Sequence, residues 1–385
     1  MDLQVRVPIA DRIRPEQYER ELDKVFKRAW LCVAHTADVP EPGTYAVVEV
    51  PTFKASLLVT RTADGSVRAF HNVCTHRGNK LVREGKGCRR QFTCGFHGWT
   101  FSNDGRLTGV PDEGQFKDFD RAVLALPEVR CEVWQGHLFV NFDKEPRYTL
   151  AEWLGELHGE FDNYFEGREE VSQYEVEVSA NWHLGVNSFT EGYHTRVLHR
   201  NTAPDYLGSK DNVHRHRPFL QLLERHSRYS APANPDHRAT PAEVVAYEGN
   251  RKLVPAYGTP REDLPPGVNP GRVSTWAFDV MEIFPNFVAI NANEWHLGLW
   301  FWPIDAGRTL IRGQRFMYKA ERPSDRLGQA YSKVRAREIL REDLNTMEAI
   351  QQVLQSGALT HMQLSQQELS LQHHFRVLDE MMTLD

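Results

Sequence analysis

The stretch of sequence that decides the fold is residues 74–101, which read CTHRGNKLVREGKGCRRQFTCGFHGWTF. Cys74 and His76 stand at its start, and after 17 intervening residues Cys94 and His97 repeat the pairing. Each half supplies one thiolate and one imidazole, which are metal-binding side chains. The two half-motifs predict a single centre with two sulfur and two nitrogen ligands.

Two kinds of metal centre use this set of ligands. In a Rieske [2Fe–2S] cluster, two thiolates bind one iron and two imidazoles bind the other, which raises the reduction potential. Structural zinc also takes two cysteines and two histidines, but usually as Cys-x-x-Cys followed by a pair of histidines. Because each half of this stretch carries one residue of each type, the spacing favours the cluster over zinc.

The flanking residues sharpen the assignment. Arg77 and Gly78 follow the first histidine, and Gly98 and Trp99 follow the second. The stretch resembles the Rieske domain of ring-hydroxylating oxygenases, whose signature is Cys-x-His-Arg-Gly, a spacer and Cys-x-x-His-Gly-Trp. Glycines let two loops approach a cluster closely, and we expect loop amides to donate to the sulfurs and Trp99 to exclude water. The resemblance implies four cluster ligands: Cys74, His76, Cys94 and His97.

Length and composition set the outer bounds. A chain of 385 residues suggests two domains, and 41% hydrophobic with 25% charged residues is an ordinary globular composition. The net charge of −6 argues against a nucleic-acid-binding protein. No apolar run is long enough for a membrane span, and the N-terminus does not resemble a signal peptide. Five cysteines, two of them assigned to the cluster, fit a reducing cytoplasm better than a disulfide framework.

The hydrophobic periodicity divides the chain. Residues 15–30 have helical spacing, whereas residues 38–145 alternate with period two, as in 44–50 and 55–60, and end in a strand near 137–142. We therefore predict an N-terminal helical segment over 1–37 that packs on the catalytic domain, a β-rich Rieske domain over 38–148 and a catalytic domain over 149–385.

The catalytic domain is expected to mix strands and helices. A helical link is predicted near 150–165, and residues 203–272, rich in Pro, Gly and charge, are predicted to be loops that cover a site. Strands are predicted at 280–284, 287–290 and 297–303. A long helix should follow from about 324 to 355, with Ser324 as its N-cap.

A second metal site is predicted on the segment 187–199, NSFTEGYHTRVLH. His194 and His199 would lie roughly 140° apart on a regular helix, so the helix must end or be distorted between them if both bind one metal. Two histidines and one carboxylate leave coordination positions open, as in non-haem Fe(II) oxygenases. The alternative is a pair of surface histidines on an ordinary helix.

The carboxylate is expected from the late helix. An apolar stripe runs along 336–354, through Ala336, Ile339, Leu340, Met347, Ile350 and Leu354, and Asp343 lies in its middle. A carboxylate that faces a core is costly unless a cation or hydrogen bonds compensate it, so Asp343 is the predicted ligand. Its neighbour Glu342 should face the flank with Arg335 and Thr346. A salt bridge from Asp343 to an arginine is the alternative.

Nearly the whole chain resembles the α (catalytic) subunit of a Rieske non-haem iron ring-hydroxylating oxygenase. The resemblance implies that His194, His199 and Asp343 bind a mononuclear Fe(II). It also implies an α+β fold in which the Rieske domain precedes a helix-grip-like antiparallel sheet with helices.

Two further residues are assigned through the same resemblance. Glu191 stands where most members of the family carry Asp, and it is expected to bridge His194 to His97 of a neighbouring subunit in a homotrimer, with or without β subunits. A plain surface glutamate is the alternative. Asn187 resembles an asparagine near the iron, and a helix-surface amide is its alternative.

The implied protein is a terminal oxygenase that uses O2 and electrons from NAD(P)H. No dinucleotide-binding motif occurs in the chain, so a separate reductase or ferredoxin must deliver the electrons. The expected reaction is mono- or cis-dihydroxylation of an aromatic or other hydrophobic ring compound. N- or O-demethylation of a quaternary amine or steroid-like substrate is the alternative. A pure electron carrier and a zinc-stabilised binding protein remain as rivals. Candidate residues for an apolar pocket are Phe189, Phe284, Val288, Ile290, Trp295, Leu297, Trp300 and Trp302.

Overall fold

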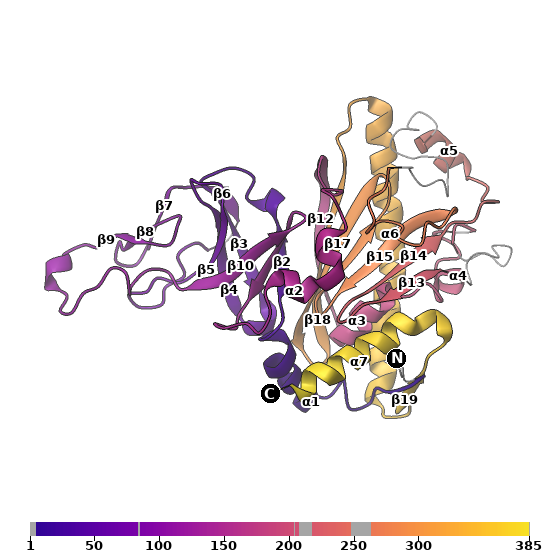
Figure 1. Ribbon diagram of the computed structural model, residues 1–385, viewed down its shortest axis with the longest axis horizontal. Helices are drawn as coiled ribbons and strands as arrows, with labels where there is room; N and C mark the ends of the chain where they lie inside the picture. The colour runs from indigo at the N-terminus through magenta and orange to yellow at the C-terminus, as the bar shows by residue number, and fades with distance from the viewer. Residues whose placement is uncertain (1–4, 84, 204, 208–217, 248–262, 385) are drawn as a thin grey trace. The chain divides into compact units, whose positions relative to one another are not determined.

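The computed structural model describes residues 5–83, 85–203, 205–207, 218–247 and 263–384. The chain divides into two compact units, Phe26–Leu150 and Met1–Val25 with Ala151–Asp385. We call them the small unit and the large unit, and Figure 1 shows the elements of each.

The small unit is built from two antiparallel sheets. The strands of the larger sheet, in spatial order, are β2 (Leu31–His35), β11 (His137–Asn141), β10 (Glu128–Trp134), β5 (Val67–His71), β4 (Ala55–Arg61), β3 (Thr44–Val50) and β6 (Lys86–Cys88). The smaller sheet contains β7 (Gln91–Thr93), β8 (Thr100–Ser102) and β9 (Leu107–Gly109). The two Cys/His loops connect β5 to β6 and β7 to β8. The predicted β-rich character of this part is confirmed.

The predicted N-terminal segment 1–37 is divided differently in the structure. The helix is shorter than predicted, because α1 (Pro15–Glu21) gives way to a π-helical turn at Leu22–Phe26. The buried run Leu31–Ala34 lies within β2, which pairs with β11, so residues 26–37 belong to the small unit. In the large unit, β1 (Arg6–Pro8) pairs with β19 (His361–Gln363).

The large unit is organised on one antiparallel sheet. Its spatial order is β12 (Arg168–Val178), β18 (Arg308–Tyr318), β17 (Trp295–Asp305), β16 (Phe287–Asn291), β15 (Trp276–Ile283), β14 (Ser227–Pro232) and β13 (Phe219–Leu222). The sequence predicted β15, β16 and β17 but missed the polar strands β12 and β18. The prediction of loops over 203–272 is wrong where β13, β14 and the helix α5 (Pro241–Tyr247) form. Residues 204, 208–217 and 248–262 of that span lie outside the described part.

Helices pack against this sheet (Figure 1). The helix α3 (Trp182–Phe189) contacts β16, β17, β18 and the long helix α6 (Pro323–Gln355), and α7 (Leu369–Thr383) contacts β13 and β14. Ser324 is not the N-cap of α6, because the Asp325 carboxylate accepts a hydrogen bond from the Arg322 amide at 2.9 Å and makes Arg322 the cap. The predicted link near 150–165 is only α2 (Leu150–Leu154) and a 3-10 turn at Gly155–Gly159. None of the helices in the described ranges combines the length and the apolar character that crossing a membrane requires.

Candidate active site

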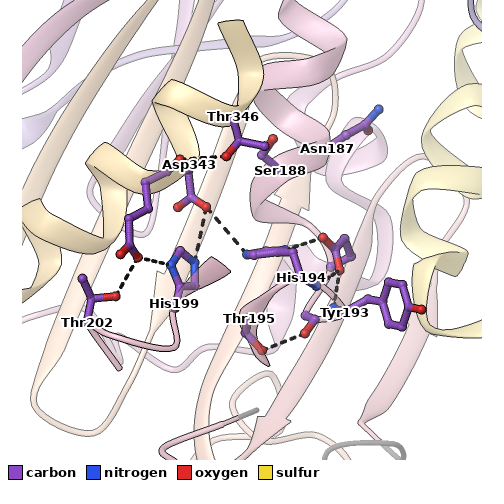
Figure 2. A network of polar contacts seen from close by, with 12 residues as sticks. Asn187, Ser188, Tyr193, His194, Thr195, His199, Thr202, Asp343 and Thr346 are labelled. Atoms are coloured by element: carbon purple, nitrogen blue, oxygen red, sulfur yellow. Dashed lines mark hydrogen bonds and ion pairs between the residues drawn. The ribbon is translucent and has the colours of Figure 1, made fainter. Parts of the chain in front are cut away.

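The two histidines predicted to bind iron flank a break in the helical segment. The helix α3 ends at Phe189, and a four-residue helix, α4 (Thr195–Leu198), begins after His194 and ends before His199. The break places the two imidazole rings face to edge, with centroids 5.1 Å apart. Figure 2 shows both rings directed toward the same carboxylate.

That carboxylate is Asp343 of α6, which is buried as predicted. Its Oδ1 lies 3.3 Å from His199 Nε2 and 3.7 Å from His194 Nε2, and it has no hydrogen-bond partner. Ligand atoms at about 2.1 Å from a shared ion would be about 3.0 Å apart at a right angle, which is close to this spacing. One ligand atom from each of the three residues lies within 4.8 Å of the other two. The arrangement therefore fits a divalent metal.

Two glutamates hold the histidines from behind. Glu191 Oε1 hydrogen-bonds His194 Nδ1, and Glu342 Oε2 accepts from His199 Nδ1 at 2.8 Å and from Thr202 Oγ1 at 2.7 Å. Both Nδ1 atoms are thus occupied, which leaves both Nε2 atoms free to bind a metal. Carboxylates that bond the second nitrogen of ligand histidines fix the ring orientation and raise ligand basicity.

The sequence placed Glu342 on a flank of α6 but did not predict what its carboxylate contacts. It was expected to face the flank that holds Arg335 and Thr346, and its carboxylate reaches the segment that carries His199 and Thr202. Thr346, one turn later on α6, donates a hydrogen bond to the backbone carbonyl oxygen of Glu342. Burial opposes protonation of His194, but the hydrogen bond and charge of Glu191, with the charge of Asp343, raise the pKa of His194. The carboxylates of Glu191, Glu342 and Asp343 thus surround the two imidazoles, which suits a bound cation.

A cavity of about 560 Å³ opens beside these ligands and includes His194, His199 and Asp343 in its wall. Its lining is rich in aromatic residues, among them Phe189, Tyr206, Tyr229, Trp276, Phe278 and Trp295. Such a size suits a small organic molecule.

The pocket prediction was right for some residues and wrong for others. Residues that line the cavity are Phe189, Ile290, Trp295 and Leu297, whereas Phe284, Val288, Trp300 and Trp302 are buried elsewhere. Trp300 is an odd number of residues from Leu297 along β17, so it lies on the opposite face of the sheet. Val288 shares the cavity face, but α3 packs on its strand.

In the small unit, the two Cys/His loops have the same backbone design. The amide of Gly78 donates to the Cys74 carbonyl at 2.9 Å, and the amide of Gly98 donates to the Cys94 carbonyl at 3.0 Å. Both glycines have positive φ, 78° and 75°, which a side chain would strain. Equivalent turns therefore present the two thiols, which are buried and hydrogen-bonded to each other.

The expected surroundings of a cluster are present. The amides of His76 and Arg77 donate to the Cys74 sulfur, and Asn79 Nδ2 lies 3.4 Å from the Cys94 sulfur. Trp99 is 3% exposed and stacks on His76 with ring centroids 4.8 Å apart. His76 Nδ1 is buried without a partner, and the rings of His76 and His97 are 4.7 Å apart. Two buried thiols and an unpartnered imidazole nitrogen fit a [2Fe–2S] cluster.

Comparison with known families assigns both units. The family model described as Rieske [2Fe-2S] domain matches residues 29–124. The model described as ring hydroxylating alpha subunit (catalytic domain) matches residues 165–384. The chain belongs to the Rieske ring-hydroxylating oxygenases.

Relatives in this oxygenase family act on different compounds. The large subunit of anthranilate 1,2-dioxygenase from Acinetobacter baylyi is 30% identical over 194 residues, which cover 49% of this chain and 41% of the relative. The oxygenase subunit of carnitine monooxygenase from Acinetobacter baumannii is 28% identical over 188 residues, 47% of this chain and 49% of the relative. The matched stretch thus spans less than half of either relative.

Solved structures of Rieske oxygenases share the fold along nearly the whole chain. A quaternary ammonium Rieske monooxygenase superposes with a TM-score of 0.78 at 19% identity, over 100% of this chain and 96% of the other. Naphthalene 1,2-dioxygenase from Rhodococcus sp. superposes with a TM-score of 0.79 at 20% identity, over 97% and 93%. The predicted α+β fold is confirmed, and the family carries a Rieske cluster and a mononuclear iron.

One predicted site residue stands apart in this oxygenase. Asn187 is on α3 and buried, and both polar atoms of its amide lack hydrogen-bond partners. Figure 2 shows its side chain directed away from His194 and Asp343, and it does not line the cavity. It is not a helix-surface amide, but the structure does not bring it to the proposed iron ligands.

Proposed function

We propose that this chain is the terminal component of an oxygenase system, which hydroxylates an aromatic or other hydrophobic ring compound. The observation that carries the proposal is the placement of His194, His199 and Asp343 in the wall of an aromatic cavity. When bound, the iron activates O2 and the cluster supplies electrons one at a time. The chain's own residues orient the substrate and exclude water.

Glu191 and Glu342 have a positioning role in this proposal. Each carboxylate keeps the proton of a ligand histidine on Nδ1, so that Nε2 presents its lone pair to the metal. The carboxylate of Asp343 is buried in the cavity wall, and a bound iron would compensate the cost of a charge there.

The electrons are proposed to come from a separate NAD(P)H-dependent reductase, directly or through a ferredoxin. We also retain the predicted homotrimer, with or without β subunits, in which Glu191 connects His194 to His97 of the neighbouring copy. Glu191 already bonds His194 within the chain, and His97 is exposed, which supports this route. A structurally similar monooxygenase is described in connection with inter-subunit electron transfer. We also propose the predicted cytoplasmic location. None of the five cysteines forms a disulfide, which is consistent with a reducing compartment.

The second candidate is oxidative demethylation or monooxygenation of a quaternary amine. The relatedness to carnitine monooxygenase favours it, and the aromatic lining could hold a cation through cation–π contacts. Product analysis separates the candidates, because demethylation releases formaldehyde whereas ring hydroxylation gives a diol or phenol.

The experiment uses the purified chain with a surrogate reductase and a panel of aromatic, steroidal and quaternary-amine compounds. Wild type should contain the two irons and two sulfides of the cluster and one further iron. His199→Ala should lose turnover and the further iron while it keeps the visible spectrum of the cluster. Product formation by His199→Ala at the wild-type rate would overturn the iron assignment.

A second variant tests the proposed bridge between subunits. Glu191→Gln should slow electron transfer from the cluster to the iron more than it weakens iron binding.

A further inference from the structure

A buried guanidinium forms part of the cavity wall. Arg315 of β18 is 6% exposed, and its guanidinium lies 4.4 Å from the centre of the Trp295 ring. One nitrogen donates to Ser332 Oγ at 2.7 Å, whereas Nε is buried and has no partner. Arginine carries five N–H donors, so most of its hydrogen-bonding capacity is unused.

No carboxylate in the described parts of the chain lies within ion-pair distance of Arg315. Burial lowers its pKa to about 10, so the group remains charged at neutral pH. Glu294 is the acidic residue that most affects it, and burial raises the pKa of Glu294 to about 7. Arg315, Arg168 and Trp295 in turn act on Glu294. At neutral pH, Glu294 is thus protonated in part of the molecules, and it does not fully compensate the positive charge of Arg315.

An uncompensated charge inside a protein is costly, because burial removes the water that would otherwise stabilise it. Arg335, a partly buried arginine of the cavity wall, does have a carboxylate, Glu243, at 2.6 Å. Arg315 therefore differs from Arg335 in having no carboxylate at ion-pair distance among the described residues, and an anionic ligand would compensate its charge.

The sheet register places Arg315 on the face that the substrate would occupy. It pairs with Ser172 of β12 and Leu297 of β17, and the row continues through Ile290 and Val280. Directly paired residues of antiparallel strands point to the same face. All five line the cavity that also contains the proposed iron ligands. One molecule in the cavity can therefore face both the guanidinium and the metal site.

We propose that Arg315 binds an anionic group of the substrate, so that the substrate class is a hydrophobic, aromatic carboxylate. This inference rests on the proposed function and narrows it. A guanidinium presents parallel N–H groups that match a carboxylate, and Trp295 and Ser332 hold it in one orientation. A quaternary ammonium compound is disfavoured, because the buried positive charge would repel it.

The test measures equilibrium binding by calorimetry, with three probes of similar ring size. They are 1-naphthoate, the neutral 1-naphthamide and the cation benzyltrimethylammonium. Wild type should bind 1-naphthoate most tightly. Arg315→Met should weaken that binding about 100-fold, because it removes one partner of a buried charge pair. Binding of 1-naphthamide should change less than threefold.

Two further variants make the result specific. Arg308→Met removes an exposed arginine of the same strand, paired with Asp305 and Glu177, and should leave 1-naphthoate binding unchanged. Arg315→Lys keeps the charge but loses the planar fork, and should bind about tenfold more weakly than wild type. It also serves if Arg315→Met fails to fold.

The outcomes separate this inference from the proposed function. Failure of wild type to bind 1-naphthoate, benzoate and 4-phenylbenzoate at millimolar concentration, or equal binding by Arg315→Met and wild type, would overturn the carboxylate site. Turnover of neutral or cationic compounds by an enzyme in which Arg315→Met leaves 1-naphthoate binding at the wild-type level would overturn the site and leave the oxygenase proposal intact. Arg315-dependent binding without turnover of any carboxylate would support the site and count against the proposed function.

Discussion

Replacing Glu342 tests whether a carboxylate of α6 prepares His199 to bind iron. Glu342 Oε2 accepts hydrogen bonds from His199 Nδ1 at 2.8 Å and from Thr202 Oγ1 at 2.7 Å. Glu342→Gln keeps the shape and one accepting oxygen but removes the negative charge. Glu342→Ala leaves His199 Nδ1 without this partner.

The magnitude follows from these contacts. A hydrogen bond to a charged group contributes about 1.5–3 kcal/mol and a neutral one about 1 kcal/mol. The loss of about 1–2 kcal/mol in Glu342→Gln corresponds to about tenfold weaker Fe(II) binding. Complete removal in Glu342→Ala should cost about 100-fold, the upper end of the range for partners of metal ligands.

The assay is anaerobic competition for Fe(II) with a chelator of known affinity. The visible spectrum of the cluster reports the amount of intact protein, because its predicted ligands belong to the other unit. Glu338→Gln is the matched control, since this glutamate is one turn earlier on α6 and, among the residues that the structure describes, pairs only with Arg337 and Arg341. Wild-type iron affinity in Glu342→Ala would refute the argument and reduce Glu342 to a helix-packing residue.

Three other predictions concern a hydrogen bond to the cluster sulfur and the titration of buried groups. Asn79→Ala should lower the reduction potential of the cluster by about 40 mV in a redox titration. The substitution removes a hydrogen bond of about 1 kcal/mol to the Cys94 sulfur, which stabilises the more negative, reduced cluster. An unchanged potential would contradict this prediction. Affinity for 1-naphthoate should fall about tenfold from pH 6 to pH 8.5 as Glu294 ionises, and Glu294→Gln should bind equally at both values. Burial lowers the pKa of both His226 and His373 to about 4. As the pH falls below about 6.5, these histidines therefore take up protons in the unfolded state but not in the folded state. The free energy of unfolding, measured with urea, should be about 4 kcal/mol lower at pH 5 than at pH 8.

The part of the site that could be predicted from sequence depends on local spacing. The Cys/His loops are short segments whose residue types define the chemistry, so Cys74 and Cys94 could be identified directly. The break between His194 and His199 followed from helix geometry, since an unbroken helix would separate the rings. Asp343 followed from its place on an apolar stripe, where a carboxylate needs compensation.

The rest depends on tertiary contacts that spacing does not encode. Glu342 precedes Asp343 on the helix, and only the path of the segment after α4 decides that it meets His199. Ile350 was predicted on the buried stripe, yet it is 39% exposed, because a helix of 33 residues does not keep one face covered throughout. Arg315 was not predicted because a charged residue in a polar strand is usually exposed, and β18 itself was missed.

The antiparallel sheet of the large unit forms one wall of the cavity beside the proposed iron ligands. The proposed iron ligands come from α6 and from the segment around α4, whereas Arg315, Leu297, Ile290 and Val280 project from the sheet. The proposed iron ligands thus come from helical segments, whereas the sheet supplies the opposite part of the wall that a bound compound would contact. Substitution of strand residues one at a time can therefore change which compound binds in the cavity, while the proposed iron ligands stay in place.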